Sequence, residues 1–315
     1  MKKITLAALI IGTFAAATAQ AQSNVTVYGL VDLGIAKTTG QPTVERENNA
    51  SRLGFKGTED LGGGLSAIFN LESEFLADTG AQKGVLFDRQ AYVGLKGAFG
   101  TAILGRTKNL VDGTIARVDP FNTYGVVGKN NEALLRSGVG TSRVNNAVTY
   151  NSPSFDGFVA SLQYVLSEVN SADAGVIGLA TYDNGPISLH AGYEKAVQAT
   201  AVAPKADLWS IGGGYKFGPA KITAAYSKGD TKVATTGEFK SYLIGLNYTV
   251  GGGDAKVSYG KQEQSNNKVN DQDTIKEFGV GYDYHLSKRT DVYAYAGRER
   301  VKSLTSYQIG LAHKF

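Results

Sequence analysis

Tyr307-Gln308-Ile309-Gly310-Leu311-Ala312-His313-Lys314-Phe315 ends the chain, and its residues alternate between two kinds of side chain. The odd positions hold Tyr, Ile, Leu, His and Phe, whereas the even positions hold Gln, Gly, Ala and Lys. Successive side chains of a β-strand point to opposite faces, so this period of two predicts a strand with one apolar and one polar face. Such a strand suits a wall that separates lipid from water.

Two further segments repeat this alternation. In residues 25–35 the odd positions are apolar or Gly, and Leu30 is the one misfit of the other phase. In residues 65–75 one phase holds Leu65, Ala67, Phe69, Leu71, Ser73 and Phe75, while Glu72 and Glu74 share the other. Soluble β-sandwiches also alternate, so the phase alone does not prove a membrane.

The spacing of the connections favours a membrane barrel, because such barrels alternate short periplasmic turns with longer external loops. Short connections are predicted at residues 59–64, 97–100, 152–157, 183–186, 218–219, 251–253 and 286–289. Long polar connections are predicted near residues 37–51, 76–86, 107–142, 167–174, 195–206, 229–238, 264–273 and 301–305. Together they join 16 antiparallel strands and place both termini on the periplasmic side. Closure is expected because an open edge in lipid leaves backbone groups unpaired, and a barrel this wide holds water.

The first residues indicate export. Lys2 and Lys3 precede an apolar run from Ile4 to Thr18, and Ala19-Gln20-Ala21 has the form that a signal peptidase accepts. We therefore predict a signal peptide at residues 1–21 and an all-β transmembrane barrel at residues 22–315, located in a Gram-negative outer membrane. Removal of two lysines lowers the formal charge of +4 to +2, which gives no indication of a nucleic-acid partner.

The stretch Ser51-Arg52-Leu53-Gly54-Phe55-Lys56-Gly57-Thr58-Glu59-Asp60-Leu61-Gly62-Gly63-Gly64 resembles the general trimeric porins of beta-proteobacteria. Further matches are residues 27–32, Leu104-Gly105-Arg106, residues 146–150 and the terminal Phe315. The resemblance implies a homotrimer of 16-stranded barrels, each with its own pore for small ions and solutes. We expect contacts with outer-membrane lipid and lipopolysaccharide, and recognition of Phe315 by the barrel assembly machinery.

The third long connection, residues 107–142, is far longer than an ordinary loop, and such loops are usually functional or disordered. The resemblance implies that it folds into the lumen and narrows the pore. Its acidic residues Asp112, Asp119 and Glu132 would then face the barrel wall across the narrowest aperture. The alternative is a disordered external loop.

Three arginines are candidates for the opposing wall. Arg52 shares the phase of Gly54 and Lys56, and Arg143 shares that of Asn145, so alternation points both into the lumen. Arg89 matches the third wall arginine of the family, but alternation groups it with the apolar residues that follow. A bulge would reconcile this, or else Arg89 lies above the lipid zone. Permanently charged guanidinium groups attract anions into an aqueous aperture, so the pore is expected to prefer anions weakly.

No catalytic, metal or cofactor site is predicted. Glu72 and Glu74 lie on one strand and face the same way, whereas a catalytic carboxylate pair flanks its substrate. Cysteine is absent, and His190, His285 and His313 have no ligand spacing. A different class of function, a surface receptor or adhesin with a plugged lumen, stays open as the alternative. Aromatic residues near strand ends are predicted to form interfacial girdles, namely Tyr215, Phe217, Tyr226, Tyr248, Tyr259, Tyr282, Tyr284, Tyr293 and Tyr295.

Overall fold

One antiparallel sheet closes on itself to form the molecule. The computed structural model describes residues 24–315 except 199, 201, 234–236 and 266–270. The expected signal peptide, residues 1–21, lies outside the described residues. Within the described ranges, no helix combines the length and apolar character needed to cross a membrane.

Sixteen long strands form the wall, in agreement with the sequence prediction. They are β1 (Asn24–Thr38), β3 (Arg52–Gly62), β4 (Leu65–Glu74), β5 (Gln90–Gly97), β6 (Gly100–Lys108), β7 (Arg143–Asn151), β8 (Phe158–Val165), β9 (Gly175–Asn184), β10 (Ile187–Lys195), β11 (Asp207–Phe217), β12 (Ala220–Asp230), β13 (Glu238–Val250), β14 (Gly253–Ser265), β15 (Asp271–His285), β16 (Thr290–Glu299) and β17 (Leu304–Lys314). A seventeenth segment, β2 (Val44–Arg46), is a three-residue strand of the first loop that pairs with β1.

The first strand closes the barrel. Residues 24–30 of β1 pair with β3, and residues 30–38 pair with β17, so Leu30 lies opposite both Arg52 and Lys314. Each of the other wall strands pairs with its neighbours in the chain. The ladder therefore runs round without a free edge, as a sheet in lipid requires.

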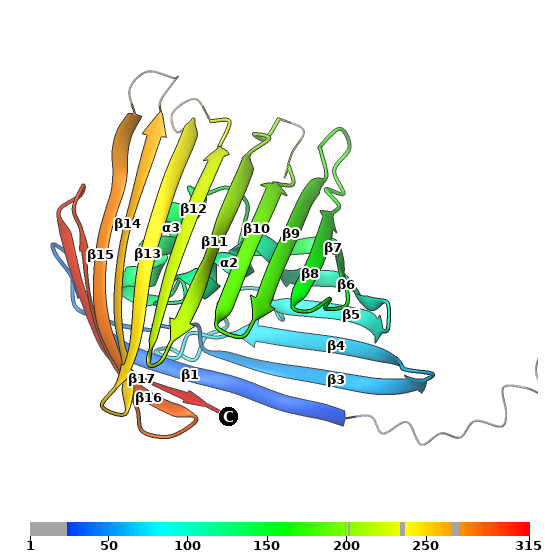
Figure 1. The fold of residues 1–315 in the computed structure, drawn as a ribbon, viewed down its shortest axis with the longest axis horizontal. Helices are drawn as coiled ribbons and strands as arrows, with labels where there is room; N and C mark the ends of the chain where they lie inside the picture. Colours follow the sequence, from blue (N-terminus) through cyan, green and yellow to red (C-terminus); the bar gives the residue numbers. More distant parts are fainter. Residues whose placement is uncertain (1–23, 199, 201, 234–236, 266–270) are drawn as a thin grey trace, which may run out of the picture.

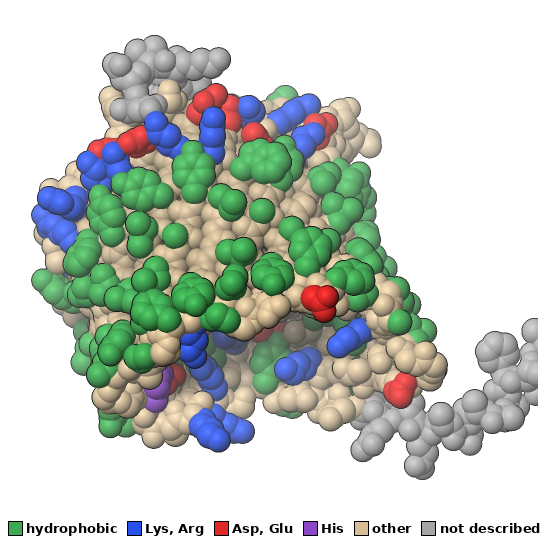
Figure 2. All heavy atoms as spheres, in the orientation of Figure 1, with side chains coloured by type: hydrophobic (Ala, Val, Ile, Leu, Met, Phe, Trp, Pro, Cys, Tyr) green, Lys and Arg blue, Asp and Glu red, His purple; other side chains and the backbone are tan. Residues whose placement is uncertain are grey.

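The two faces of the wall differ as the alternation predicts. Val25 and Val27 on the outer face are 58% and 56% exposed, whereas Leu30, the misfit of the pattern, is 1% exposed and packs inside. Figure 2 shows a belt of apolar side chains across the visible face of the barrel, with charged side chains of both signs along its upper margin and Lys and Arg near the hollow at its lower end. This belt fits the hydrocarbon layer of a membrane.

The girdle prediction is wrong for two residues. Tyr293 and Tyr295 are 2% and 6% exposed because the small residues of β16, among them Ala294, face outward instead. The Tyr293 hydroxyl donates to Asp32 at 2.6 Å, and the Tyr295 hydroxyl donates to Asp283 at 2.5 Å. Both rings thus belong to the lumen.

The third long connection, residues 109–142, folds into the lumen and is called loop 3 below. It contains α2 (Leu110–Val118) and α3 (Gly125–Arg136), which lie within the barrel behind β10–β13 in Figure 1. Asn109 caps α2, since its side-chain oxygen accepts from the backbone N–H groups of Val111 and Asp112 at 2.9 and 3.2 Å. The disordered external loop that the sequence left open is therefore wrong.

Loop 3 is packed against the wall by an apolar core. Its side chains interlock with inward-facing wall residues, and the members that are 0–1% exposed are Val111, Ile115, Leu134, Leu135, Val139, Ile177, Leu208 and Leu243. Glycines of the wall make room for it: a Cβ on Gly245 would meet Pro120, and a Cβ on Gly279 would meet Val127. Close packing of this kind holds loop 3 in one position.

Candidate functional site: the constriction of the lumen

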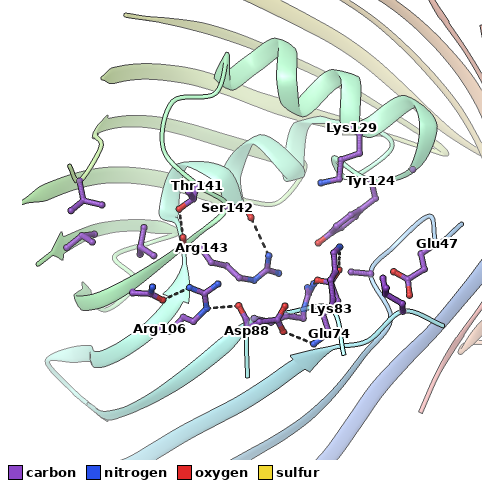
Figure 3. A pocket seen from close by; sticks show the side chains of 18 of the residues that line it. Glu47, Glu74, Lys83, Asp88, Arg106, Tyr124, Lys129, Thr141, Ser142 and Arg143 are labelled. Carbon is purple, nitrogen blue, oxygen red and sulfur yellow. Dashed lines mark hydrogen bonds and ion pairs between the residues drawn. The ribbon is translucent and has the colours of Figure 1, made fainter. Parts of the chain in front are cut away.

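Loop 3 and one side of the wall enclose a cavity of about 780 Å³. Arg106 and Arg143 reach into it from β6 and β7, while Tyr124 and Lys129 descend from loop 3, and Lys83 lies below (Figure 3). Among the described residues that line it are six cations, Arg46, Lys83, Arg89, Arg106, Lys129 and Arg143, and five acids, Glu45, Glu47, Glu74, Asp78 and Asp88. The excess of positive charge is small.

Arg89 faces the lumen although alternation groups it with outward residues. It precedes β5, which begins at Gln90, so the strand's alternation does not extend to it. Phe87 adopts a positive φ of 59°, and the chain turns before the strand begins. The Arg89 Nε lies 2.5 Å from Glu72 Oε1, and its Nη1 lies 2.7 Å from Glu74 Oε2. An irregular segment ahead of the strand, and not a bulge within it, explains the position of Arg89.

The charge of Arg89 is closely compensated. Its side chain is 6% exposed, and those of Glu72 and Glu74 are 8% and 6% exposed. Burial alone lowers the pKa of the Arg89 guanidinium, but Glu72 and Tyr124 raise this pKa above its ordinary value. Lys83 adds a second ion pair to Glu74. Glu72 and Glu74 are thus held in charged contacts, consistent with lumen polarity rather than catalysis.

Arg52 lies in the lumen, as alternation predicts. Its Nη1 donates to Asn49 Oδ1 and to the Ala50 carbonyl, both at 3.0 Å, while its neighbours Leu53 and Phe55 face outward. Arg89 and Glu72 lie within electrostatic range of it. Arg52 is not among the residues that line the cavity itself and stands beside it.

Arg143 lines the cavity together with Arg106, which the sequence interpretation did not select. Arg106 Nε donates to the Asp88 carbonyl at 2.5 Å, and Arg143 Nη1 to Ser142 Oγ at 3.4 Å. Strict alternation groups Arg106 with the outward Leu104, but the register between β6 and β7 shifts at Gly105, whose φ is +128°. The motif Leu104-Gly105-Arg106 was the available signal, since an internal glycine in a strand often marks a bulge.

Three of the four lumen arginines have no acidic side chain in close contact. In the described part of the chain, Arg52, Arg106 and Arg143 have no carboxylate oxygen within 4.0 Å, whereas Arg89 has two such partners. Tyr124 lies in a positive field as well: burial raises the pKa of its hydroxyl, but Lys108 and Arg89, with a smaller effect of Arg143, bring this pKa below its ordinary value. The cavity is therefore an aqueous aperture with a positive side.

The sequence predicts that the acids of loop 3 face this positive side. The structure places them elsewhere. Asp119 is 3% exposed, and its two carboxylate oxygens accept from the backbone N–H groups of Phe121 and Thr123, at 3.0 and 2.7 Å, and from Asn131 Nδ2 at 2.8 Å. Burial raises the pKa of Asp119 to about 6. Its carboxylate shapes the loop from within because these hydrogen bonds use its acceptors.

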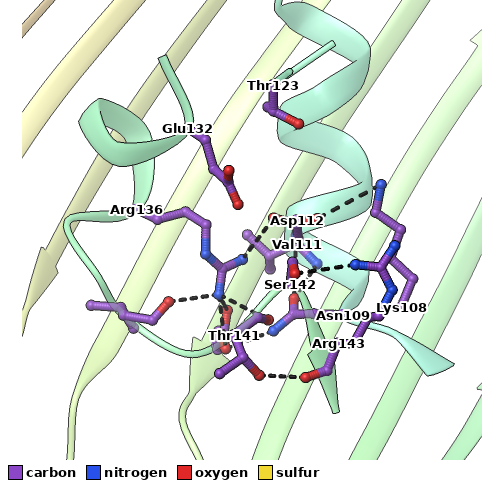
Figure 4. Close-up of polar contacts among 12 residues, drawn as sticks. Lys108, Asn109, Val111, Asp112, Thr123, Glu132, Arg136, Thr141, Ser142 and Arg143 are labelled. Carbon is purple, nitrogen blue, oxygen red and sulfur yellow. Dashed lines mark hydrogen bonds and ion pairs between the residues drawn. The ribbon is translucent and has the colours of Figure 1, made fainter. Parts of the chain in front are cut away.

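Asp112 is likewise internal, as Figure 4 shows. It lies 3.8 Å from Arg136 and 3.6 Å from Lys108, and burial raises the pKa of its carboxyl group. Glu132 pairs with Lys129 of its own helix at 2.7 Å. The carboxylates among the residues that line the cavity come from the first loop, Glu45 and Glu47, and from residues 74–88.

Lys129 and Tyr124 are the loop 3 residues that face the arginines. The Lys129 Nζ lies 5.7 Å from the centre of the Tyr124 ring.

No group of three or more His, Cys, Asp and Glu side chains among the described residues is arranged to hold a metal ion.

Fold and site together define an outer-membrane channel protein: a closed barrel, apolar outside, with a polar lumen narrowed by an internal loop. A family model described as Gram-negative porin matches residues 5–304. The chain belongs to this family of outer-membrane porins.

Individual relatives agree. The chain is 33% identical to outer membrane porin protein 32 of Delftia acidovorans and 32% identical to an outer membrane porin protein of Bordetella pertussis, with both chains covered completely. An anion-selective porin from Comamonas acidovorans superposes with a TM-score of 0.80 at 29% identity, over 93% of this chain and all of that one. OmpT of Vibrio cholerae in its trimer form, at 18% identity and a TM-score of 0.75, shares the fold over 93% of this chain and 99% of its own.

Proposed function

We propose that the barrel is a passive diffusion channel for small hydrophilic solutes and ions, with a weak preference for anions set by Arg52, Arg89 and Arg143 together with Arg106. The observation that carries this proposal is the group of three arginines without an acidic partner: Arg106 and Arg143 line the cavity under loop 3, and Arg52 stands beside it. Guanidinium groups stay charged at any relevant pH. The similarity to an anion-selective porin supports the same assignment.

The acids of the aperture set the strength of the preference. Glu45 and Glu47 of the first loop line the same cavity as Arg106 and Arg143, so a solute crosses a transverse field in place of a uniformly positive ring. Such a field favours small polar solutes that align their dipoles and disfavours apolar solutes that must displace ordered water. Filtering by size, charge and polarity needs no tight binding site and no catalytic step.

Single-channel recording in planar bilayers tests the diffusion role. The proposal expects stable steps of conductance that persist without any ligand. A lumen that stays closed would instead favour the surface receptor or adhesin. The cavity beneath the external loops is the reason to expect conduction.

We further propose that the functional unit is a homotrimer and that residues 1–21 are removed on export, so that the mature chain begins at Gln22. The trimer form of a protein of the same fold supports the first point. Gel migration without boiling tests it, with one band expected near three times the unfolded mass. Mass spectrometry of protein extracted from outer membranes tests the second.

Two envelope partners complete the proposal. Lys228 and Lys240 occupy directly opposite positions on the outer face of β12 and β13, next to the external loop between them, where they suit the phosphates of lipopolysaccharide. Phe315 is 47% exposed at the periplasmic end, where it is accessible to the barrel assembly machinery. Deletion of Phe315 is expected to reduce the folded protein recovered from outer membranes and to leave the amount synthesised unchanged.

A further inference from the structure

A second group of cations lies on the lumen wall, apart from the constriction. Lys216 near the end of β11 and Lys221 near the start of β12 occupy directly opposite positions of the ladder. They share the inner face with the buried Ser210 and Thr223, and Thr223 donates to the Val118 carbonyl of loop 3 at 2.6 Å. The tight turn at residues 218–219 joins the two strands, which places both lysines at the periplasmic end.

Loop 3 adds a third cation to this place. Arg117 stands in the last turn of α2 and forms an ion pair with Asp183, which lies on the inner face of β9. Arg117, Lys216 and Asp183 all lie within electrostatic range of Lys221. Among these four residues, three cations face one acid, so a positive charge is left over.

The arrangement carries an electrostatic cost that calls for a ligand. Like charges at directly opposite positions of an antiparallel pair destabilise a sheet. Lys221 is also half-buried, and its side chain packs so closely that a Cβ on Gly214 would meet it. An anion of more than one charge relieves this repulsion, because it accepts from several of the donors at once.

We propose that Lys216, Lys221 and Arg117 form a second anion site at the periplasmic mouth, which takes polyvalent oxyanions of the phosphate class. None of the three lines the constriction cavity, so the site is separate from the arginines there. Its part in transport rests on the proposed function, because the site acts on passing anions only if the lumen is open. The site makes the channel asymmetric: polyvalent anions are held at the periplasmic end before or after they pass loop 3.

Side-resolved block of the current by inorganic pyrophosphate tests the proposal. In a bilayer with channels inserted in one orientation, pyrophosphate is added to either chamber, and the concentration that halves the current is measured. The site predicts block at a lower concentration from the periplasmic side. The double variant Lys216→Gln, Lys221→Gln should raise that concentration roughly tenfold, as expected for the loss of two partly exposed charged contacts.

Matched variants separate the site from general charge effects. Lys205→Gln with Lys302→Gln removes two exposed lysines of the external loops and should leave block from the periplasmic side unchanged. Lys216→Arg with Lys221→Arg keeps both charges and should retain block. Equal block from both sides, or an unchanged half-blocking concentration in the Lys→Gln pair, would overturn the proposal.

A binding measurement that does not depend on conduction tests the anion site separately from the proposed diffusion role. Calorimetric titration of pyrophosphate into detergent-solubilised protein should detect a site that the Lys216→Gln, Lys221→Gln pair loses. If the channel proves closed but this binding is present, the diffusion role fails and the anion site stands. If the channel conducts but the titrations of wild type and pair are identical, the anion site fails alone.

Discussion

Arg136 of α3 and Glu194 of β10 form a buried ion pair, with 3.1 Å between Nη2 and Oε2 and with side chains 5% and 1% exposed. The same carboxylate accepts from the Asn109 side chain, which caps α2, at 2.7 Å. One wall residue therefore holds loop 3 at its first residue and at the end of its second helix.

Glu194→Ala should release loop 3 from this contact. Removing one partner of a buried pair costs about 3–5 kcal/mol, and Arg136 then keeps only its longer contact with Asp112, at 3.8 Å. We expect single-channel currents that are larger on average and that fluctuate, where the wild type is steady. Glu132→Gln is the control, because Glu132 pairs with Lys129 of its own helix and has no such role. A quiet trace of wild-type amplitude in Glu194→Ala would contradict the assignment.

Asp119 should make stability depend on pH. Burial raises the pKa of Asp119 from its ordinary 3.8 to about 6. Between these two pKa values the folded protein therefore binds more protons than the unfolded chain. The contribution of Asp119 to stability is full below the unfolded pKa of 3.8 and is lost as the pH rises through the folded pKa of about 6. Asp119→Asn should abolish this dependence, because the amide does not titrate.

Thermal unfolding followed by circular dichroism at about pH 4 to about pH 7 checks the point, with the difference between wild type and Asp119→Asn as the readout. Titrations that both proteins share cancel in this difference. The idea fails if this difference does not vary with pH.

The contact between Gly29 and Phe315 allows a steric test of barrel closure. Gly29 and Phe315 exchange two backbone hydrogen bonds of 3.1 and 3.2 Å, and the Phe315 ring covers the position where a Gly29 Cβ would stand. Gly29→Ala should cost about 1–3 kcal/mol by overpacking. Gly178→Ala is the matched strand control, because a Cβ there meets nothing within 4 Å. Equal midpoints of thermal unfolding for the two variants would argue against this role of Gly29.

Substitutions of Arg89 and Arg143 should differ in their effect on stability. Arg89→Ser leaves the carboxylates of Glu72 and Glu74 without their shared partner and should destabilise the barrel by about 3–5 kcal/mol. Arg143→Ser should cost little, as no ion pair is broken. Urea unfolding compares the two variants, and adding Glu72→Gln and Glu74→Gln to Arg89→Ser should restore stability. A failure of that rescue would show that the pairs do not hold this part of the wall.

The wall was predictable from sequence, and the interior was not. A strand between lipid and water has to alternate, which is why the phase of Val25, Leu30 and Arg52 predicted their faces correctly. Alternation holds only within a strand, so it assigned the wrong face to Arg89, which precedes β5. The shift of register at Gly105 is the reason why alternation did not place Arg106 in the lumen.

The packing of loop 3 has no periodic signature. Nothing in the sequence showed that Asp112 and Asp119 would be used within the loop, or that Gly245 and Gly279 would make room for it. For β16, alternation was ambiguous because alanine suits either face. Tyr293 and Tyr295 were therefore assigned to the lipid side, whereas both contact the interior.

The reversal potential in a salt gradient tests most directly whether the unpaired arginines of the lumen set the selectivity. The wild type should prefer anions, and Arg52→Ser with Arg143→Ser should shift the permeability ratio toward cations by roughly threefold or more, since confined charges create potentials of several kT. Arg298→Ser removes an exposed arginine from β16 and should leave the potential at its wild-type value. An unchanged potential in the double variant, or an equal shift in Arg298→Ser, would contradict the account.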